Sequence, residues 1–344
     1  MRTTFLAFFL GALLLASAPS PAPAASPDGY TYYEVGDIDA PTPGPTETGL
    51  MLMGGGDWDY RAFRWFLAKA GHGHIVILRA SGDGEGGEAI YGAIGGAASV
   101  RTLVFDDRKA SEDPRVLAIL DRADGVFLAG GDQANYVRFW KGTSVQKALN
   151  AHVARGRPIG GTSAGLAILG GVGYGAMDGG SVDSETALTN PMGPEVTMVG
   201  DFLVMPYLAH VVTDTHFSVR DRLGRLIAFV AQVRASRDPQ AVGLGVDEDG
   251  ALCVDADGVG RFFTASSGHA WLVQPDGAPQ IAPGEPLDYP SVRVTTLGPD
   301  GEIDLKTMRI TRPAFSGIAS VQAGRLVNVP VPVVPGPGAR SDGG

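Results

Sequence analysis

The sequence has very little cysteine: of its 344 residues, only Cys253 carries a thiol. A single thiol excludes an internal disulfide bond, and its position far from the N-terminus excludes a lipid anchor at an export cleavage site. Long apolar runs are also missing, since no stretch approaches the ~20 apolar residues that a membrane-spanning helix needs. Basic charge is in deficit, because 27 basic against 37 acidic side chains give a formal net charge of −10. This balance argues against nucleic acid or an anionic membrane as a partner, and we expect a soluble protein.

The first residues have the pattern of a signal peptide. Arg2 supplies the positive charge, residues 5–15 a short apolar run, and residues 22–24 (Ala-Pro-Ala) the small side chains typical of a cleavage site. We expect residues 1–24 to be removed on export, to the periplasm or to the medium. The sequence leaves open which of these is the destination and whether the protein forms a homodimer.

Proline and glycine concentrate in residues 39–48 and again near the C-terminus, without the apolar periodicity of a packed element. We interpret residues 25–48 as a linker and residues 329–344 as a disordered tail. Between them we predict a catalytic domain over residues 49–274 and a β-rich extension over residues 275–328. The region between the linker and the tail is long enough to bury a sizeable hydrophobic core.

Apolar runs and amphipathic stretches alternate along the first half of the chain. The runs 75–78, 103–105 and 126–128 are each followed by residues with helical periodicity. One such stretch follows Asp113-Pro114, a typical N-cap with proline at the first helical position. The alternation predicts an α/β fold with a mainly parallel, doubly wound sheet and helices on both faces.

Residues 161–165, Gly-Thr-Ser-Ala-Gly, match the G-x-S-x-G pattern of a nucleophile on a strand-to-helix turn. The flanking glycines remove side chains that would clash in such a sharp turn. The hydroxyl of Ser163 then projects from the sheet edge, and the N–H of Ala164 points at the oxygen that becomes negative during acyl transfer. Similar turns also occur as tight connections and as phosphate cradles.

A nucleophilic serine needs a base, and the sequence has six histidines. His216 is the best candidate, because it follows the strand-like run 211–215 and so lies where active sites of α/β sheets gather. We expect a helix to begin at His216, with Val219 on its apolar face. The other histidines are better explained as structural. No metal site is predicted, since His72 and His74 lack further ligands at a useful spacing.

Three separated blocks resemble the cyanophycinase and aspartyl dipeptidase family of serine peptidases. The blocks are residues 130–133 (Gly-Gly-Asp-Gln), residues 160–165, and residues 214–217 (Asp-Thr-His-Phe) with the arginines that follow. Their order and spacing match, and the resemblance covers residues 52–254. It implies a flavodoxin-like sheet related to the class I glutamine amidotransferases, with serine in place of their cysteine. It also implies a Ser-His-Glu triad and no cofactor.

The resemblance assigns roles residue by residue. It makes Ser163 the nucleophile and His216 the base. The family's acid lies between these two, where this chain offers Asp183, Glu185 and Glu195. Glu185 matches the acidic position best, with Asp183 as the alternative. The acid would hold the imidazole in the right tautomer and stabilise its cation.

The resemblance further implies an oxyanion hole and a substrate pocket. The N–H groups of Gly131 and Ala164 would bind the oxyanion. The residues implied to bind substrate are Gln133, Thr215, Arg220, Arg222 and Arg225. Guanidinium groups suit carboxylates, which favours acidic or β-aspartyl peptides; the alternative is a basic helix face paired with nearby aspartates. Thr215 stands where cyanophycinases carry glutamine, so we expect poor activity on cyanophycin itself.

The leading hypothesis is therefore an exported serine peptidase or amidase. A second reading is an α/β-hydrolase esterase, because residues 54–56 (Gly-Gly-Gly) resemble an oxyanion loop and the order Ser, Glu, His is the same. Too few βα units separate Ser163 from His216 for that fold. A third reading is a non-catalytic binding protein that keeps the fold.

Overall fold

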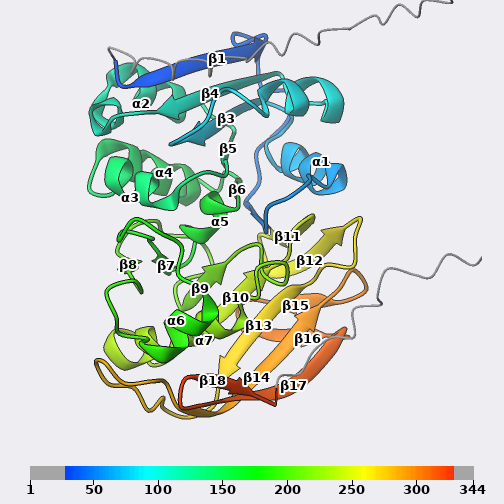
Figure 1. Cartoon of the computed structure of the whole chain (residues 1–344). Coiled ribbons are helices and arrows are strands. Elements are labelled where there is room, and N and C mark those ends of the chain that lie inside the picture. The colour runs from blue at the N-terminus through cyan, green and yellow to red at the C-terminus, as the bar shows by residue number, and fades with distance from the viewer. Residues whose placement is uncertain (1–27, 329–344) are drawn as a thin grey trace, which may run out of the picture.

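The computed structural model describes residues 28–328, which form two β-sheets and the helices that cover them (Figure 1). The expected signal peptide, residues 1–24, and the expected tail, residues 329–344, lie outside the described residues. Within the described range, no helix is both long and apolar enough to cross a membrane.

The first sheet has ten strands and the second has eight. In spatial order the first contains β1 (Tyr30–Gly36), β4 (Ser99–Phe105), β3 (His74–Arg79), β5 (Gly125–Leu128), β6 (Ile159–Thr162), β2 (Gly49–Met53), β11 (Gly250–Asp255), β12 (Val259–Thr264), β15 (Glu302–Asp304) and β16 (Arg309–Thr311). The second contains β18 (Arg325–Val327), β17 (Phe315–Gln322), β14 (Tyr289–Leu297), β13 (Ala270–Pro275), β10 (Val242–Val246), β9 (Val211–Asp214), β7 (Val172–Tyr174) and β8 (Met198–Gly200).

Strand direction differs between the two sheets. In the first, the neighbours β4-β3-β5-β6-β2 run parallel. The second is mostly antiparallel, except that β9 runs parallel to both β7 and β10. The fold is therefore mixed α/β.

The helices and helical turns are α1 (Tyr60–Lys69), η1 (Ala89–Ile94), η2 (Arg108–Glu112), α2 (Pro114–Asp121), α3 (Gln133–Trp140), α4 (Ser144–Ala154), α5 (Ala164–Ala167), α6 (Ser184–Thr189) and α7 (Leu223–Ser236). Helix α1 covers one face of the parallel strands, and α2, α3 and α4 cover the other (Figure 1). The side chains of strand β2 contact both layers of helices. Leu50 and Leu52 belong to the core cluster beneath α2 to α4, whereas Met51 belongs to the cluster beneath α1. Successive strand side chains point to opposite faces, so an all-apolar strand is buried on both sides.

The local predictions agree with these elements. The runs 75–78, 103–105 and 126–128 lie in β3, β4 and β5. Asp113 caps α2, its side chain accepting a hydrogen bond from the Arg115 N–H, and Pro114 is the first helical residue. These predictions rested on nearest neighbours in the sequence, which is where periodicity and capping act.

Three predictions about extent need correction. Residues 25–48 are not simply a linker, since β1 pairs antiparallel with β4 at the edge of the first sheet; its aromatic and β-branched residues favour a strand. The boundary at residues 274/275 falls inside one continuous sheet, because β13 pairs with β14. The predicted parallel sheet also does not extend to the strand that leads to His216, because β9 belongs to the second sheet.

The helix expected to begin at His216 begins later. His216 and Asp221 have φ values of 46° and 48°, a left-handed conformation that does not propagate a right-handed helix. Helix α7 starts at Leu223. Val219, expected on the apolar helix face, is 65% exposed. Arg220 and Arg222 therefore lie in the turn that precedes the helix.

Candidate active site

Ser163 lies between β6 and α5, in a strained turn with φ 52° and ψ −120°. The two glycines around it are required by close backbone approach. A Cβ on Gly161 would lie 2.6 Å from the carbonyl carbon of Gly165, and a Cβ on Gly165 would lie 2.1 Å from the Leu128 oxygen. The chain can thus turn sharply enough to leave the Ser163 hydroxyl at the carboxyl edge of the parallel strands.

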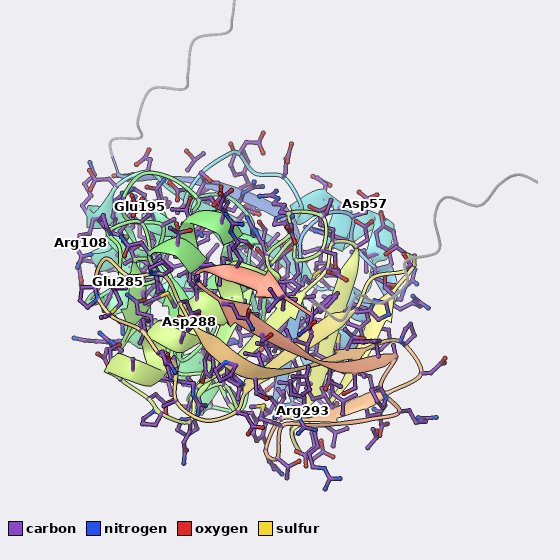
Figure 2. The ribbon with its side chains drawn as sticks, turned by 60° about the horizontal axis from the view of Figure 1, so that its bottom comes forward. Asp57, Arg108, Glu195, Glu285, Asp288 and Arg293 are labelled. Carbon is purple, nitrogen blue, oxygen red and sulfur yellow. The ribbon has the colours of Figure 1, made fainter. Side chains whose placement is uncertain are left out.

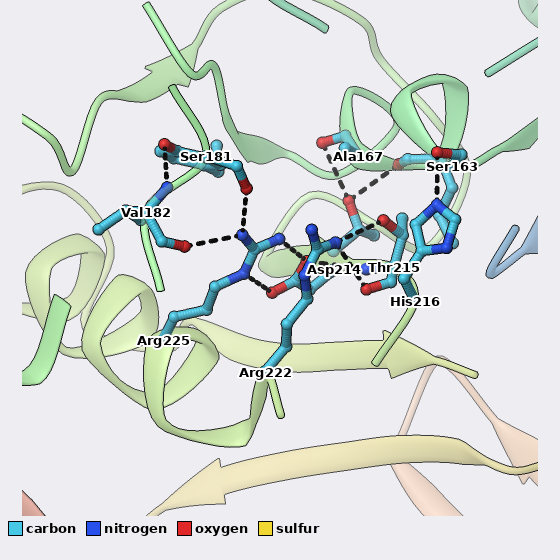
Figure 3. A network of polar contacts seen from close by, with 12 residues as sticks. Ser163, Ala167, Ser181, Val182, Asp214, Thr215, His216, Arg222 and Arg225 are labelled. Atoms are coloured by element: carbon cyan, nitrogen blue, oxygen red, sulfur yellow. Dashed lines mark hydrogen bonds and ion pairs between the residues drawn. The ribbon is translucent and has the colours of Figure 1, made fainter. Parts of the chain in front are cut away.

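His216 follows β9 and reaches the nucleophile. Its Nε2 lies 2.7 Å from the Oγ of Ser163 (Figure 3). The backbone around it is fixed by two hydrogen bonds, from the His216 N–H to the Gly54 oxygen and from the Phe217 N–H to the Val246 oxygen. The fold therefore brings together the two residues that the sequence predicted as nucleophile and base, 53 positions apart.

The acid beside His216 is Glu248, and the prediction of Glu185 is corrected. Nδ1 of His216 forms a hydrogen bond with Oε1 of Glu248, in the turn between β10 and β11. Glu185 is exposed in the first turn of α6. The alternative, Asp183, caps that helix by accepting a hydrogen bond from the Thr186 N–H, and Glu195 lies at the periphery of the molecule (Figure 2).

Sequence reasoning missed Glu248 although a signal for it existed. Strands β9 and β10 are parallel neighbours, so their carboxyl ends meet at one edge of the sheet. His216 follows the first strand and Glu248 follows the second. In the sequence alone, residues 247–250 (Asp-Glu-Asp-Gly) have the composition of an acidic turn, and the pairing of the two strands is not visible there.

The residues on either side of Glu248 hold its turn in place. Asp247 is buried and accepts four hydrogen bonds: from the Ser218 N–H at 2.9 Å and its Oγ at 2.6 Å, from the His269 N–H at 2.8 Å and from the Trp271 Nε1–H at 3.0 Å. Oδ1 of Asp249 accepts a hydrogen bond from the Asp57 N–H. The turn is therefore tied both to the segment that follows His216 and to the loop after β2.

Burial lowers the pKa of His216 below its usual value of 6.5. The hydrogen bond with Glu248 acts in the opposite direction and raises this pKa, while the positive charge of Arg220 lowers it. Because burial is the largest effect, the imidazole is neutral at pH 7. A neutral Nε2 beside a serine hydroxyl is able to accept its proton.

A cavity of about 280 Å³ opens in front of Ser163. The predicted site residues that line it are Gly131, Gln133, Ser163, Ala164, Thr215, His216, Arg220 and Arg222. Among the described residues, none accepts a hydrogen bond from the N–H of Gly131 or Ala164. Both donors therefore remain available to an oxyanion formed on a substrate in this cavity.

Arg225 does not line the cavity, which corrects its predicted role. It is 2% exposed, and its Nε and Nη2 donate to the two carboxylate oxygens of Asp214 (Figure 3). Its Nη1 donates to Ser181 Oγ and to the Val182 oxygen, each at 3.0 Å. All three nitrogens of this guanidinium therefore donate hydrogen bonds within the protein. A buried ion pair of this kind needs hydrogen bonds to most of its polar atoms, because each ion loses its hydration on burial.

Arg222 and Arg220 differ in their freedom to meet a ligand. Arg222 is buried, and its Nη1 donates to the Thr215 oxygen at 2.8 Å and to the Thr215 Oγ1 at 3.1 Å. Burial lowers the pKa of Arg222 to about 10, so it is still charged at neutral pH. Arg220 is exposed at the cavity. Both arginines place positive charge beside Ser163. The two hydrogen bonds from Arg222 also hold the backbone and the hydroxyl of Thr215 in position.

A serine on a strand-to-helix turn, hydrogen-bonded to a histidine that is in turn bonded to a carboxylate, defines the class of serine hydrolases. Comparison with known proteins narrows this class. Residues 97–191 match the family model of peptidase family S51. The chain is 28% identical over 295 residues to the cyanophycinase of Trichormus variabilis, covering 81% of this chain and 92% of that protein.

Two further matches agree. The cyanophycinase of Synechococcus elongatus is 30% identical over 221 residues, which cover 62% of this chain and 63% of that protein. The crystal structure of a peptidase from an acI-B1 Actinobacterium covers 75% of this chain and 97% of its own, with a TM-score of 0.51 and 14% identity, which shows a shared fold. The resemblance to the cyanophycinase and aspartyl dipeptidase family is thus confirmed, and the protein is a serine-type peptidase.

Proposed function

We propose that this peptidase cleaves peptide or isopeptide bonds through a triad of Ser163, His216 and Glu248 and an acyl-enzyme. The observation that carries the proposal is the unbroken chain of hydrogen bonds from Ser163 Oγ through both ring nitrogens of His216 to Glu248. Glu248 keeps the proton of the neutral ring on Nδ1, which leaves the lone pair of Nε2 facing the hydroxyl.

The first half of the reaction forms the acyl-enzyme. Ser163 Oγ attacks the scissile carbonyl carbon while His216 Nε2 takes the hydroxyl proton. The negative oxygen of the tetrahedral intermediate accepts hydrogen bonds from the N–H groups of Gly131 and Ala164. His216 then gives its proton to the leaving nitrogen as the carbon–nitrogen bond breaks. In the second half, water gives a proton to His216 Nε2 as it attacks the ester carbonyl carbon. His216 then returns this proton to Ser163 Oγ as the ester bond breaks, which releases the acid and restores the serine.

We infer that the substrates are acidic or β-aspartyl peptides. Support comes from the charge at the cavity. Arg220 and Arg222 line it, and the single carboxylate of Asp214 pairs with both Arg222 and Arg225, so positive charge is in excess beside the nucleophile. A carboxylate on the substrate would meet a guanidinium group there. The alternative hypothesis, an α/β-hydrolase esterase, takes residues 54–56 as an oxyanion loop. The close approach of Gly55 to the His216 ring gives this glycine another role.

Two broader parts of the proposal concern fold type and location. We infer that the parallel strands β4-β3-β5-β6-β2, with helices on both faces, form a flavodoxin-like sheet of the kind found in class I glutamine amidotransferases.

We also propose that the protein is exported after cleavage near Ala24, on the strength of its N-terminal sequence pattern. N-terminal sequencing of the protein recovered from cell fractions and medium tests the second point.

The experiment that tests the catalytic proposal combines labelling with kinetics. A serine-reactive phosphonate should label the wild type at Ser163 and fail to label the Ser163→Ala variant. The same substitution should reduce turnover of aspartyl dipeptides by roughly six orders of magnitude, because the other triad members act through the serine. A panel of esters tests the alternative. A variant that kept a tenth of the wild-type rate, with its fold intact by circular dichroism, would refute the proposal.

A further inference from the structure

A second and larger cavity, of about 710 Å³, adjoins the nucleophile from the other side. The two cavities meet along the backbone that carries the site. Gly130 and Thr162 line the larger cavity, while the next residues, Gly131 and Ser163, line the smaller one. A Cβ on Gly130 would lie 3.3 Å from Cβ of Ser163, so the lining of the larger cavity comes close to the nucleophile.

The larger cavity has a mixed lining, in which aliphatic and aromatic residues lie beside polar and charged ones. Ile77 and Ala129, at 1% and 4% exposure, lie in its interior, and the aromatic rings of Trp58 and Tyr60 belong to its lining. Trp58 is held rigidly, because it stacks on Phe63 with ring centroids 4.5 Å apart. A fixed aromatic ring beside buried aliphatic side chains favours an apolar or aromatic side chain of a ligand, since such a surface gains most from displacing water.

The charged residues of this cavity lie toward solvent. Asp57 and Glu85 are exposed, and Figure 2 shows Asp57 at the periphery of the molecule. Arg79 is half-buried and donates to the backbone oxygens of Ser81 and Glu85, which holds the loop over the cavity. Asp57 and Glu85 therefore lie at the rim of the cavity, and two nitrogens of Arg79 are already bonded to the loop backbone.

The position of the larger cavity relative to the base indicates which part of a substrate it meets. The ring of His216 lies against Gly55, and the next residue, Gly56, lines the larger cavity. In acyl transfer the histidine gives its proton to the leaving amine. The residue that carries this amine therefore lies on the His216 side of the scissile bond, next to the larger cavity.

From these observations we propose that the larger cavity is the subsite for the leaving residue, and that it selects a large apolar or aromatic side chain there. This inference rests on the proposed function. The preferred substrate then combines an acidic or β-aspartyl residue in the Ser163 cavity with a residue such as phenylalanine across the scissile bond. Trp58 is its specificity-determining residue.

The test compares β-aspartyl-Phe, β-aspartyl-Ala and β-aspartyl-Lys, together with their α-aspartyl counterparts, in the wild type, Trp58→Ala and Trp65→Ala. Trp65 is the matched control, because it is a half-buried tryptophan of α1 that does not line the cavity. The wild type should prefer Phe over Ala by about tenfold or more in kcat/KM, the scale expected for burying an aromatic side chain. Trp58→Ala should remove this preference by lowering kcat/KM for the Phe substrate, whereas Trp65→Ala should keep both the preference and the rate on the Ala substrate.

A filling variant, Ala89→Phe, addresses the case in which Trp58→Ala loses stability. Ala89 is half-buried and lines the cavity, so a larger side chain there should reduce the Phe preference in a folded protein. Equal rates for Phe and Ala, a preference for Lys, or a Phe preference that survives both substitutions would overturn the subsite while the catalytic proposal stands.

A binding measurement separates the failure of this inference from the failure of the proposed function. If no peptide is hydrolysed, calorimetric titration of the Ser163→Ala variant with the Phe and Ala peptides replaces the kinetics. Tighter binding of the Phe peptide by about tenfold supports the subsite, and equal binding overturns it. Absence of phosphonate labelling at Ser163 in the wild type counts against the proposed function alone.

Discussion

The imidazole of His216 lies against the backbone of Gly55. A Cβ built on Gly55 would come within 2.2 Å of His216 Cε1, and Gly55 has a φ of 106°, a conformation that side chains with a Cβ rarely adopt. Glycine is therefore required here for two reasons. Its backbone forms a wall that keeps the ring between Ser163 and Glu248.

Replacing Gly55 by alanine should displace the ring and with it the proton acceptor. We expect Gly55→Ala to lower kcat/KM by about a hundredfold or more, because shifts of about 1 Å in a catalytic group have effects of this size. The control is Gly277→Ala, at a glycine that also has positive φ but has no atoms near its Cβ position. A Gly55→Ala enzyme with more than half of the wild-type kcat/KM would show that the ring position does not depend on this contact.

The identity of the acid is tested by two conservative substitutions. Glu248→Gln should reduce kcat by about ten-thousandfold, because the amide does not hold the His216 tautomer that the reaction needs. Glu185→Gln should leave kcat within about twofold, since Glu185 is exposed on α6. Steady-state kinetics on an aspartyl dipeptide measures both, and the opposite ranking would restore Glu185 as the acid.

The pH dependence of the reaction should reflect the lowered pKa of His216. The neutral ring is the active form, so kcat/KM should rise with pH through a midpoint below 6.5. Since the unfolded chain binds the proton more tightly, the same shift also makes the folded state lose stability as the pH falls from 6.5 through the folded pKa.

Two variants should move that midpoint in opposite directions. Arg220→Ala removes a positive charge that lowers the pKa, so its midpoint should rise; Glu248→Gln removes a hydrogen bond that raises the pKa, so its midpoint should fall. A pH profile with a neutral substrate suits the first variant, and an NMR titration of His216 suits the second. Shifts of the same sign would contradict the assigned causes.

The two arginines at positions 220 and 225 should affect different properties. Arg225→Ala leaves the buried carboxylate of Asp214 with only its longer ion pair to Arg222, at 3.5 Å. This should cost about 3 kcal/mol of unfolding free energy, the low end of the range for breaking a buried pair, measured by urea denaturation. Arg220→Ala should leave stability unchanged, because that side chain is exposed. It should instead lower kcat/KM for acidic peptides by about tenfold and spare neutral ones, the low end of the range for charge partners at an interface. Equal losses on both substrate classes would contradict a role in charge recognition.

Much of the site was predictable because its signals are local. The turn around Ser163 depends on the glycines at positions 161 and 165, which the sequence shows directly, and the same holds for the Asp113 cap of α2. The local pattern also predicted the parallel strands β3, β4 and β5. His216 was found because it follows a recognisable strand.

The sequence by itself thus determined the proposed nucleophile, the proposed base and the α/β class, since nearest-neighbour sterics and periodicity fix a strained turn and the strands beside it. Only the tertiary structure decided which carboxylate lies beside His216, how the strands divide into two sheets, and which arginines line the cavity. Glu248 meets His216 because β9 and β10 pair in parallel, and Arg225 is withdrawn from the cavity because Asp214 is buried beside it. Such contacts depend on which strands become neighbours and which charges lose their water, and these outcomes are set by packing across the whole chain.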